Sequence, residues 1–175
     1  NNKWKSKNSI PVVAFENLPV DEQVRMFVDI NHKQKSVSKN LLTTIIGDLM
    51  WNSRIYNDAI RALQSRLLQR LGDRDSSPLY RRIIVGENKK SDTTCITLDY
   101  IISYGFKKTD LFARVQKNKL ISTGSLWVDG YDLMLEKAYS YFSSVFEFIK
   151  EECSDSWNRG SSEGGLISMN VGVMS

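Results

Sequence analysis

Apolar residues recur at helical spacing through much of the first 71 residues, and this periodicity most constrains how the chain can fold. The first such segment starts with the acidic pair at positions 21 and 22, which favours a helix N-terminus, and its apolar face comprises Val20, Val24, Phe27 and Val28. The second follows Ser38, a typical N-cap, and its apolar positions are Leu41, Leu42, Ile45, Ile46 and Leu49. Gly47 lowers the helix propensity of that segment and is compatible with a close contact there.

A third helix is expected over residues 54–71, with Ser53 as its cap and Gly72 as its end. Its apolar face comprises Ile55, Ala59, Ala62 or Leu63, Leu67 and Leu71. The opposite face is polar, with Arg54, Arg61, Gln64, Arg66, Gln69 and Arg70. The sequence therefore predicts three consecutive amphipathic helices.

Strand patterns are short and few. Residues 10–15 read as a buried strand with Pro11 near its start, and residues 81–85 as a second strand. Residues 93–96 form either a further strand or the lead into a helix over 97–104, which Gly105 closes. We therefore expect an α+β fold that is predominantly helical, with a small sheet containing residues 10–15 and with Val24, Phe27 and Leu41 in one core.

The second half is expected to be helical with polar breaks. A helix is predicted over residues 109–116 and a loop over 117–125. Residues 126–152 predict one long amphipathic helix, or a pair split at Gly130. Residues 154–165 have the composition of a linker, and residues 166–174 are apolar.

Composition and missing motifs exclude several classes of function. Cys95 and Cys153 are far apart and lack metal-type spacing, which is typical of a reduced, cytoplasmic protein. His32 is the sole histidine, so a two-histidine metal site within the chain is excluded. The chain contains neither a phosphate-binding loop nor a nucleophile elbow, and no apolar run long enough to span a bilayer. We expect no metal, cofactor or membrane partner.

The net charge of +4 is unevenly spread along the chain. Residues 1–10, 31–44 and 59–71 each hold three Lys or Arg side chains and no acid, whereas residues 129–163 lean acidic. This distribution indicates either a face suited to polyanions or a mixed, solvated surface.

The stretch at residues 27–37 carries the densest polar signal. An apolar pattern ends at Ile30, and then Asn31, His32, Lys33, Gln34 and Lys35 follow without an acid. Such side chains suit a phosphate or a base edge, but they are also typical of a solvated loop between two helices. Asn31 and Gln34 either cap the last carbonyls of the helix or present amides to a ligand.

The same stretch resembles the DGQHR-domain family, the family of DndB-like proteins. The matching positions are Phe27, Ile30, Asn31, Gln34 and Val37, preceded by the sequence Ile-Pro-Val-Val at residues 10–13 and by the acidic helix start. The resemblance covers about the first 45 residues well and the rest loosely. The Asp-Gly-Gln-His-Arg motif itself does not occur, so we expect this chain to be an internal fragment that begins just after it.

The resemblance implies a ParB/sulfiredoxin-like fold and a DNA-linked role. Residues 1–50 would be the C-terminal part of a DGQHR domain, with a mainly helical region over 51–175 packed on it. The implied function is a DNA-binding regulatory or accessory protein of a DNA phosphorothioation or restriction-modification system, with DNA and other proteins of that locus as partners. Two alternatives stay open: part of a nucleotide-hydrolysing or nuclease enzyme whose active site lies upstream, and a homo-oligomeric scaffold built on the long C-terminal helix.

The candidate nucleic-acid contacts are basic and amide side chains from two regions. They comprise Asn31, His32, Lys33, Gln34, Lys35, Lys39, Arg54, Arg61, Arg66 and Arg70. We expect Lys33, Lys35 and the arginines at 61, 66 and 70 to share one basic face with the loop at Asn31. Catalysis by His32 is not expected, because no nucleophile follows a recognisable pattern beside it.

Overall fold

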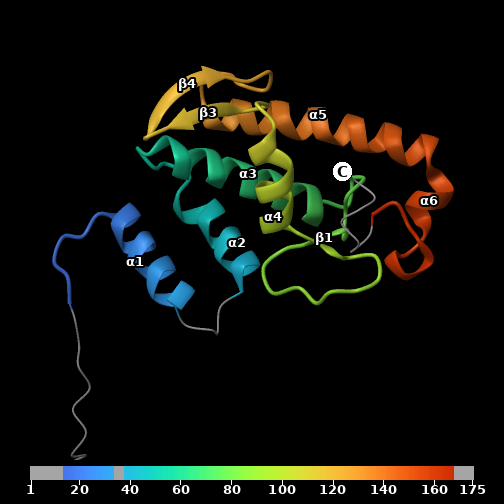
Figure 1. Cartoon of the computed structure of the whole chain (residues 1–175), viewed down its shortest axis with the longest axis horizontal. Coiled ribbons are helices and arrows are strands. Elements are labelled where there is room, and N and C mark those ends of the chain that lie inside the picture. The colour runs from blue at the N-terminus through green and yellow to red at the C-terminus, as the bar shows by residue number, and fades with distance from the viewer. Residues whose placement is uncertain (1–13, 34–37, 168–175) are drawn as a thin grey trace, which may run out of the picture.

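The computed structural model describes residues 14–33 and 38–167, and its helices surround one central helix, α3 (Tyr56–Asp73). Helix α1 (Val20–Lys33) packs against α2 (Lys39–Leu49), and α2 packs against α3. Helix α5 (Tyr131–Glu152) lies along another side of α3 (Figure 1). The fold is thus α+β and mostly helical, as the sequence predicted.

Helix α3 is central because it buries residues around most of its circumference. Ala59, Ala62, Leu63, Leu67 and Leu71 have no exposed surface, which confirms the predicted apolar face. Its ends differ from the prediction: the helix begins at Tyr56 without a side-chain cap and continues through Gly72 to Asp73. The Oγ atom of Ser53 instead accepts a hydrogen bond from the backbone amide of Ile55, before the helix begins.

Helix α2 has the predicted cap and a close contact with α3. The Oγ atom of Ser38 accepts a hydrogen bond from the Leu41 amide at 3.1 Å. A Cβ built at Gly47 would lie 2.8 Å from Ser65 Oγ, so the absence of a side chain lets α2 approach α3. Leu42 and Ile46 are buried as expected, but Leu49 is 44% exposed because it lies on the outer side of the helix.

The described residues form two small two-stranded sheets, whereas the sequence predicted one small sheet. Strands β1 (Ile83–Ile84) and β2 (Ile96–Thr97) pair in parallel, within or next to the predicted strand regions. Strands β3 (Ala113–Gln116) and β4 (Lys119–Thr123) form an antiparallel hairpin. The predicted helix over 109–116 and the predicted loop over 117–125 are therefore wrong. Lys117 and Asn118 adopt positive φ angles of 49° and 58°, which suit a tight hairpin turn.

Between the two sheets, residues 98–108 form three consecutive helical segments of different hydrogen-bond pattern. Helix α4 (Leu98–Tyr100) continues into a π-helical turn, η1 (Ile101–Gly105), and then a 3₁₀ turn, η2 (Phe106–Lys108). This agrees with the helix predicted over residues 97–104. A buried amide fixes its start, because Asn40 on α2 accepts a hydrogen bond from the Leu98 amide and donates to the Ile84 carbonyl.

The C-terminal part is packed rather than a linker. Helix α5 begins after Gly130, whose φ is 101°, and residues 126–130 are not helical, so the helix starts five residues later than predicted and is not one of a pair split at that glycine. Helix α6 (Ser154–Asn158) and the 3₁₀ turn η3 (Ser161–Glu163) occupy the segment predicted to be linker-like. Trp157 is 2% exposed, because its indole packs into the main core, and such burial is not compatible with a free linker.

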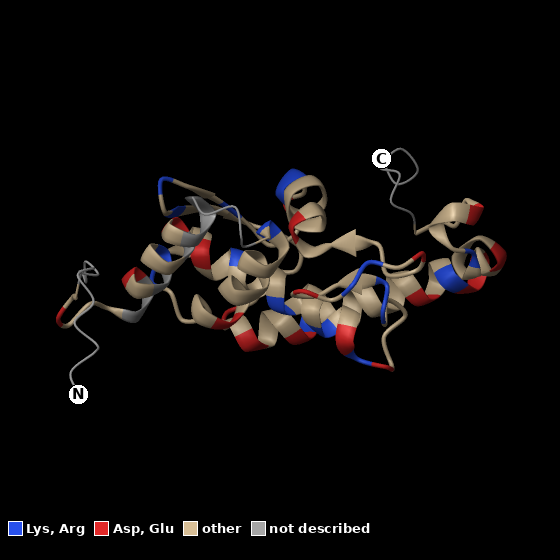
Figure 2. Cartoon of the chain, turned by 90° about the horizontal axis from the view of Figure 1, so that it is seen from below, with Lys and Arg blue, Asp and Glu red and all other residues tan. Residues whose placement is uncertain are grey.

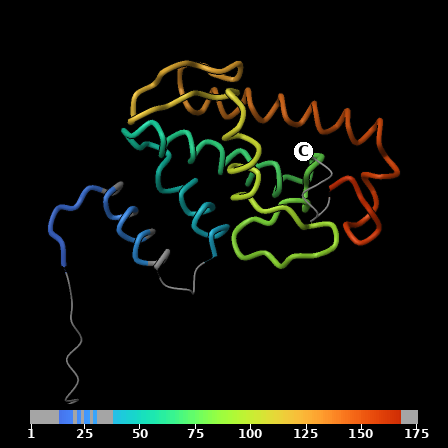
Figure 3. The backbone as a smooth tube through the Cα atoms, viewed as in Figure 1, coloured from blue at the N-terminus to red at the C-terminus, as the bar shows by residue number. Residues whose placement is uncertain are grey.

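A long-range contact closes the C-terminal part onto the loop that follows β1. Asp92 accepts hydrogen bonds from the backbone amide and the hydroxyl of Ser162, at 2.8 Å and 2.9 Å. Figure 3 shows the two segments side by side, although 70 residues separate them in the sequence.

The N-terminal predictions are tested only in part. Residues 10–13 of the predicted strand lie outside the described residues, and Ala14 and Phe15 belong to no strand. Phe27 is 45% exposed and does not belong to the main core, so the expectation that Val24, Phe27 and Leu41 share one core is wrong for Phe27, and the side chain of Val24 lies outside what the structure describes. Within the described residues, α1 packs mainly on α2. Among the described helices, none is long and apolar enough to cross a membrane.

Candidate functional site

The polar stretch after Ile30 is where the sequence placed the site. Asn31, His32 and Lys33 form the last residues of α1, but their side chains are outside what the structure describes. Gln34 and Lys35 also lie outside the described residues. Lys39, at the start of α2, is exposed. The role of this loop stays a prediction.

The three arginines of α3 do not share one face. Successive helical residues are about 100° apart, so Arg61 and Arg70, nine positions apart, point to opposite sides. Arg61 lies 3.7 Å from a carboxylate oxygen of Asp99, at the start of α4. Arg70 instead pairs in bidentate fashion with Glu136 of α5. The predicted single basic face is therefore wrong for these residues.

Arg66 and Arg70 are occupied by contacts within the fold. The Nε atom of Arg66 donates to the Gly47 carbonyl at 2.8 Å, and its guanidinium lies 4.2 Å from the centre of the Trp51 ring. The Arg70 guanidinium lies 4.2 Å from the Tyr139 ring centre, and its hydrogen bond to Glu136 raises the pKa of the arginine. These contacts leave Arg54 and Arg61 as the more accessible arginines of this region.

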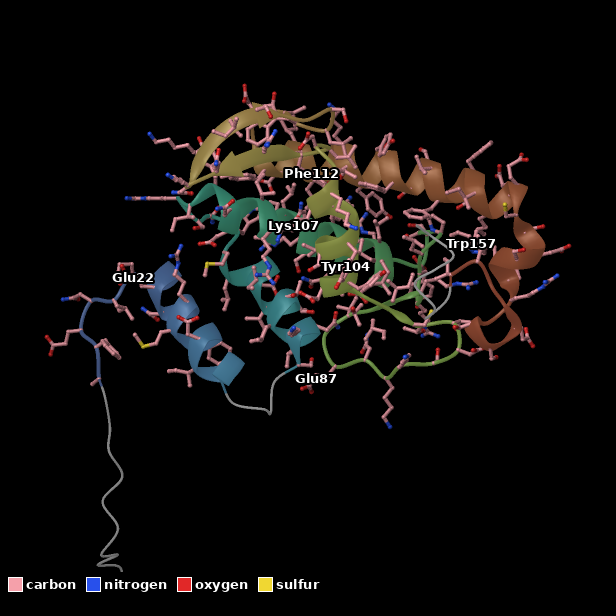
Figure 4. The ribbon with its side chains drawn as sticks, in the orientation of Figure 1. Glu22, Glu87, Tyr104, Lys107, Phe112 and Trp157 are labelled. Atoms are coloured by element: carbon pink, nitrogen blue, oxygen red, sulfur yellow. The ribbon has the colours of Figure 1, made fainter. Side chains whose placement is uncertain are left out.

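A pocket of about 640 Å³ lies where α3, the turns η1 and η2, and strand β3 meet. Figure 4 labels Lys107 and Phe112 in this region, in front of α3. The polar part of the lining comprises Asn57, Arg61, Gln64, Ser103, Lys107, Thr109, Asp110 and Arg114, and the apolar part includes Ile60, Ile102 and Phe112. Its volume is within the range of small-molecule sites, about 300–1,000 Å³.

The charge balance of the pocket is positive. Arg61, Lys107 and Arg114 face one acid of the lining, Asp110. Neither Lys107 nor Arg114 forms an ion pair with any residue in the described ranges, and the pair between Arg61 and Asp99 is long, at 3.7 Å. The pocket can therefore offer cationic donors to an anionic ligand.

Gln64 gives the pocket a buried polar group. Its residue surface is 8% exposed, and its side-chain amide has no hydrogen-bond partner among the described residues. The amide atoms of Gln64 are not among the fully buried polar atoms that lack a partner, so they reach the surface of the pocket. An amide that lines a pocket without a protein partner is suited to a ligand.

Further cations lie next to the pocket, where the β3–β4 hairpin meets the start of α3. The Tyr56 amide donates to Asn118 Oδ1 at 2.7 Å, which attaches the hairpin turn to the helix N-terminus. Arg54, Lys117 and Lys119 are exposed beside this contact. We name the combined surface the basic strip, and it comprises Arg54, Arg61, Lys107, Arg114, Lys117 and Lys119.

Charges elsewhere on the molecule are mixed. Figure 2 shows basic and acidic segments interspersed along the helices, α5 included. In the parts of the chain that the structure describes, no group of three or more His, Cys, Asp and Glu side chains is placed to hold a metal ion. The basic strip is therefore distinguished by position, since six cations gather around one hairpin and one pocket.

Sequence reasoning found Arg54 and Arg61 but missed the rest of the strip. Lys107 and Arg114 were read as parts of ordinary helices or breaks, and Gln64 as a solvated residue of α3. One signal was present: residues 105–108 place a glycine and two lysines directly after a segment rich in isoleucine and tyrosine. That segment contains the π-helical turn, a feature that is frequent at functional sites.

Comparison of the chain with models of protein families, with curated proteins and with solved structures finds no match in any of the three.

Proposed function

We propose that the protein is a DNA-binding regulatory or accessory protein. The observation that carries this proposal is the basic strip, in which cations from the start of α3, from η2 and from the β3–β4 hairpin lie on adjoining elements. A duplex carries one negative charge for about every 1.7 Å of its axis, so a surface with several accessible cations displaces counterions from it.

The contacts of the strip suit the DNA backbone better than the bases. Lysine and arginine side chains on phosphates position a protein on DNA without specifying sequence. The start of α3 adds the positive end of a helix dipole to the same surface. Any sequence preference would come from other side chains, and the amides Asn31 and Gln34 remain candidates for that role.

The cellular setting of the proposal rests on the resemblance to DGQHR-domain proteins. The resemblance supports a role in a DNA phosphorothioation or restriction-modification system, with the other proteins of such a locus as partners, and the cysteine usage supports a cytoplasmic protein. Only part of the matching stretch belongs to the described residues, so this finer assignment draws its support from the sequence.

Paired lysine variants test DNA binding. Replacing Lys117 and Lys119 with alanine removes two exposed cations from the hairpin. The matched control replaces Lys89 and Lys90, two exposed lysines on the loop after β1. In a fluorescence anisotropy titration of labelled duplex, the hairpin variant should bind at least about 10-fold more weakly than the parent, and the control should match the parent. Equal losses in both variants would show that the strip has no special role.

A second candidate function, a homo-oligomeric scaffold, is favoured by one face of α5. Leu133, Tyr141 and Phe148 are 65%, 46% and 63% exposed, and their spacing places them on one side of the helix. Tyr141 lies midway between the other two. Antiparallel pairing of two copies about Tyr141 would thus place Leu133 of one copy opposite Phe148 of the other.

A further inference from the structure

We propose that the pocket between α3, η1, η2 and β3 binds a phosphomonoester group. Arg61, Lys107 and Arg114 would hold the phosphate oxygens, and the amide of Gln64 would bind a polar group of the ligand beside the phosphate. The group has two possible sources with the same chemistry: a free phosphorylated small molecule, or the 5′-phosphate at the end of a DNA strand.

The three cations match the charge of a phosphomonoester. At neutral pH such a group carries about −1.5 to −2 charges and three strong acceptor oxygens. Arginine donates to it through a planar fork, and lysine adds a compact charge. Asp110 opposes an anion, so the phosphate would lie on the side of the three basic residues.

The depth of Gln64 favours a terminal phosphate over a continuous DNA backbone. A phosphodiester in a duplex continues in both directions and stays on the surface of the protein. Only 8% of the Gln64 residue surface is exposed, at the pocket, so a duplex backbone that passes over the outside of the strip would contact little of it. A ligand that ends in the pocket would reach it.

The rest of the lining suits a small, partly apolar ligand. Asn57, Ser103 and Thr109 provide polar groups that both donate and accept, while Ile60 and Ile102 provide an apolar wall. This combination of a few polar groups with apolar surface is typical of small-molecule sites. Phe112, 1% exposed and in edge-to-face contact with Phe106, supports the wall from behind.

Substitutions can separate phosphomonoester binding in the pocket from duplex binding on the strip. Arg61, Lys107 and Arg114 belong to both the basic strip and the pocket, whereas Gln64 belongs to the pocket alone. Lys117 and Lys119 belong to the strip alone. A variant at Gln64 should thus affect phosphomonoester binding, and a variant at the two lysines should affect duplex binding.

The test is calorimetric titration of the full chain with four probes. They are inorganic phosphate, ribose 5-phosphate, a short single-stranded oligonucleotide with a 5′-phosphate, and the same oligonucleotide with a 5′-hydroxyl. The variants are Gln64→Leu and Arg114→Gln, with Arg159→Gln as the control because Arg159 is exposed and outside the pocket. Arg114 is exposed on a strand, so its variant keeps the test valid even if Gln64→Leu does not fold.

The expected result is that at least one probe with a terminal phosphate binds and that Arg114→Gln weakens binding about 10-fold or more. Gln64→Leu should weaken the organic phosphates more than inorganic phosphate, and Arg159→Gln should have no effect. Preference for ribose 5-phosphate would identify a free small molecule, and preference for the 5′-phosphorylated oligonucleotide would identify a strand end. Absence of phosphate binding at millimolar concentration, equal binding of the two oligonucleotides without ribose 5-phosphate binding, or pocket variants that bind like the parent would overturn the proposal.

Discussion

The two cysteines differ in environment, and this difference predicts their reactivity. Cys95 is buried, and its thiol donates to the Ile167 carbonyl at 3.5 Å. Burial raises the pKa of the Cys95 thiol, and nearby Arg82 offsets the rise only in part. Cys153 is exposed at the end of α5. Because the thiolate is the reactive form, iodoacetamide should alkylate Cys153 in the folded protein and Cys95 only after unfolding.

The raised pKa of the Cys95 thiol also predicts how the free energy of unfolding depends on pH. A raised thiol pKa means that the folded state keeps its proton to a higher pH than the unfolded state. The free energy of unfolding is therefore unaffected by Cys95 below the ordinary thiol range and falls as the pH rises through it. A Cys95→Ala variant should lose this alkaline dependence in urea titrations. For the alkylation experiment, fast reaction of both cysteines in the native protein would contradict the burial of the Cys95 thiol.

At the scale of elements, the contact of α2 with α3 depends on Gly47. An alanine there gains about 1 kcal/mol of helix propensity. Its Cβ, however, would lie 2.7 Å from Gln69 Nε2 and 2.8 Å from Ser65 Oγ, and overpacking typically costs about 1–3 kcal/mol. We expect Gly47→Ala to lower the melting temperature. Gly105→Ala is the control, because its nearest new contact is an ordinary 3.7 Å, and a larger loss there would contradict the packing argument.

The long helices, the short strand regions near residues 81–85 and 93–96 and the helical segment over 97–104 could be predicted from sequence, whereas the β3–β4 hairpin and the packing of residues 154–165 could not. Helix α5 and the cap at Ser38 follow from local signals that the fold does not override. The hairpin could not be predicted, because four to five residues per strand fit either period and the turn at Lys117–Asn118 lacks glycine. Residues 154–165 have a linker composition, but Trp157 packs into a core that distant residues provide.

At the scale of the whole molecule, the candidate site is a product of tertiary structure. Arg61, Lys107 and Arg114 come from α3, η2 and β3, and no sequence spacing relates them. Periodicity did indicate that Arg61 is exposed, but it grouped Arg61 with Arg70, whose partner on α5 is 66 residues away. Side-chain pairing across elements is invisible to local patterns, so the predicted face could not be corrected before the fold was known.

The exposed face of α5 predicts self-association. Replacing Leu133 and Phe148 with aspartate should shift a concentration-dependent dimer to monomer in sedimentation velocity, because charges at an apolar interface are not compensated. Ser76→Asp adds a charge on an exposed loop and serves as control. A parent protein that stays monomeric at all accessible concentrations would rule out the scaffold function.

The salt dependence of duplex binding tests the central claim most directly. If the basic strip contacts the DNA backbone, the association constant should fall steeply with salt, since each phosphate contact contributes about −0.9 to the slope of log K against log salt. With the six cations of the strip engaged, we predict a slope of about −5 for the parent and about −3 to −4 for the variant that lacks Lys117 and Lys119. A slope near zero, or identical slopes for the two proteins, would contradict DNA binding by this surface.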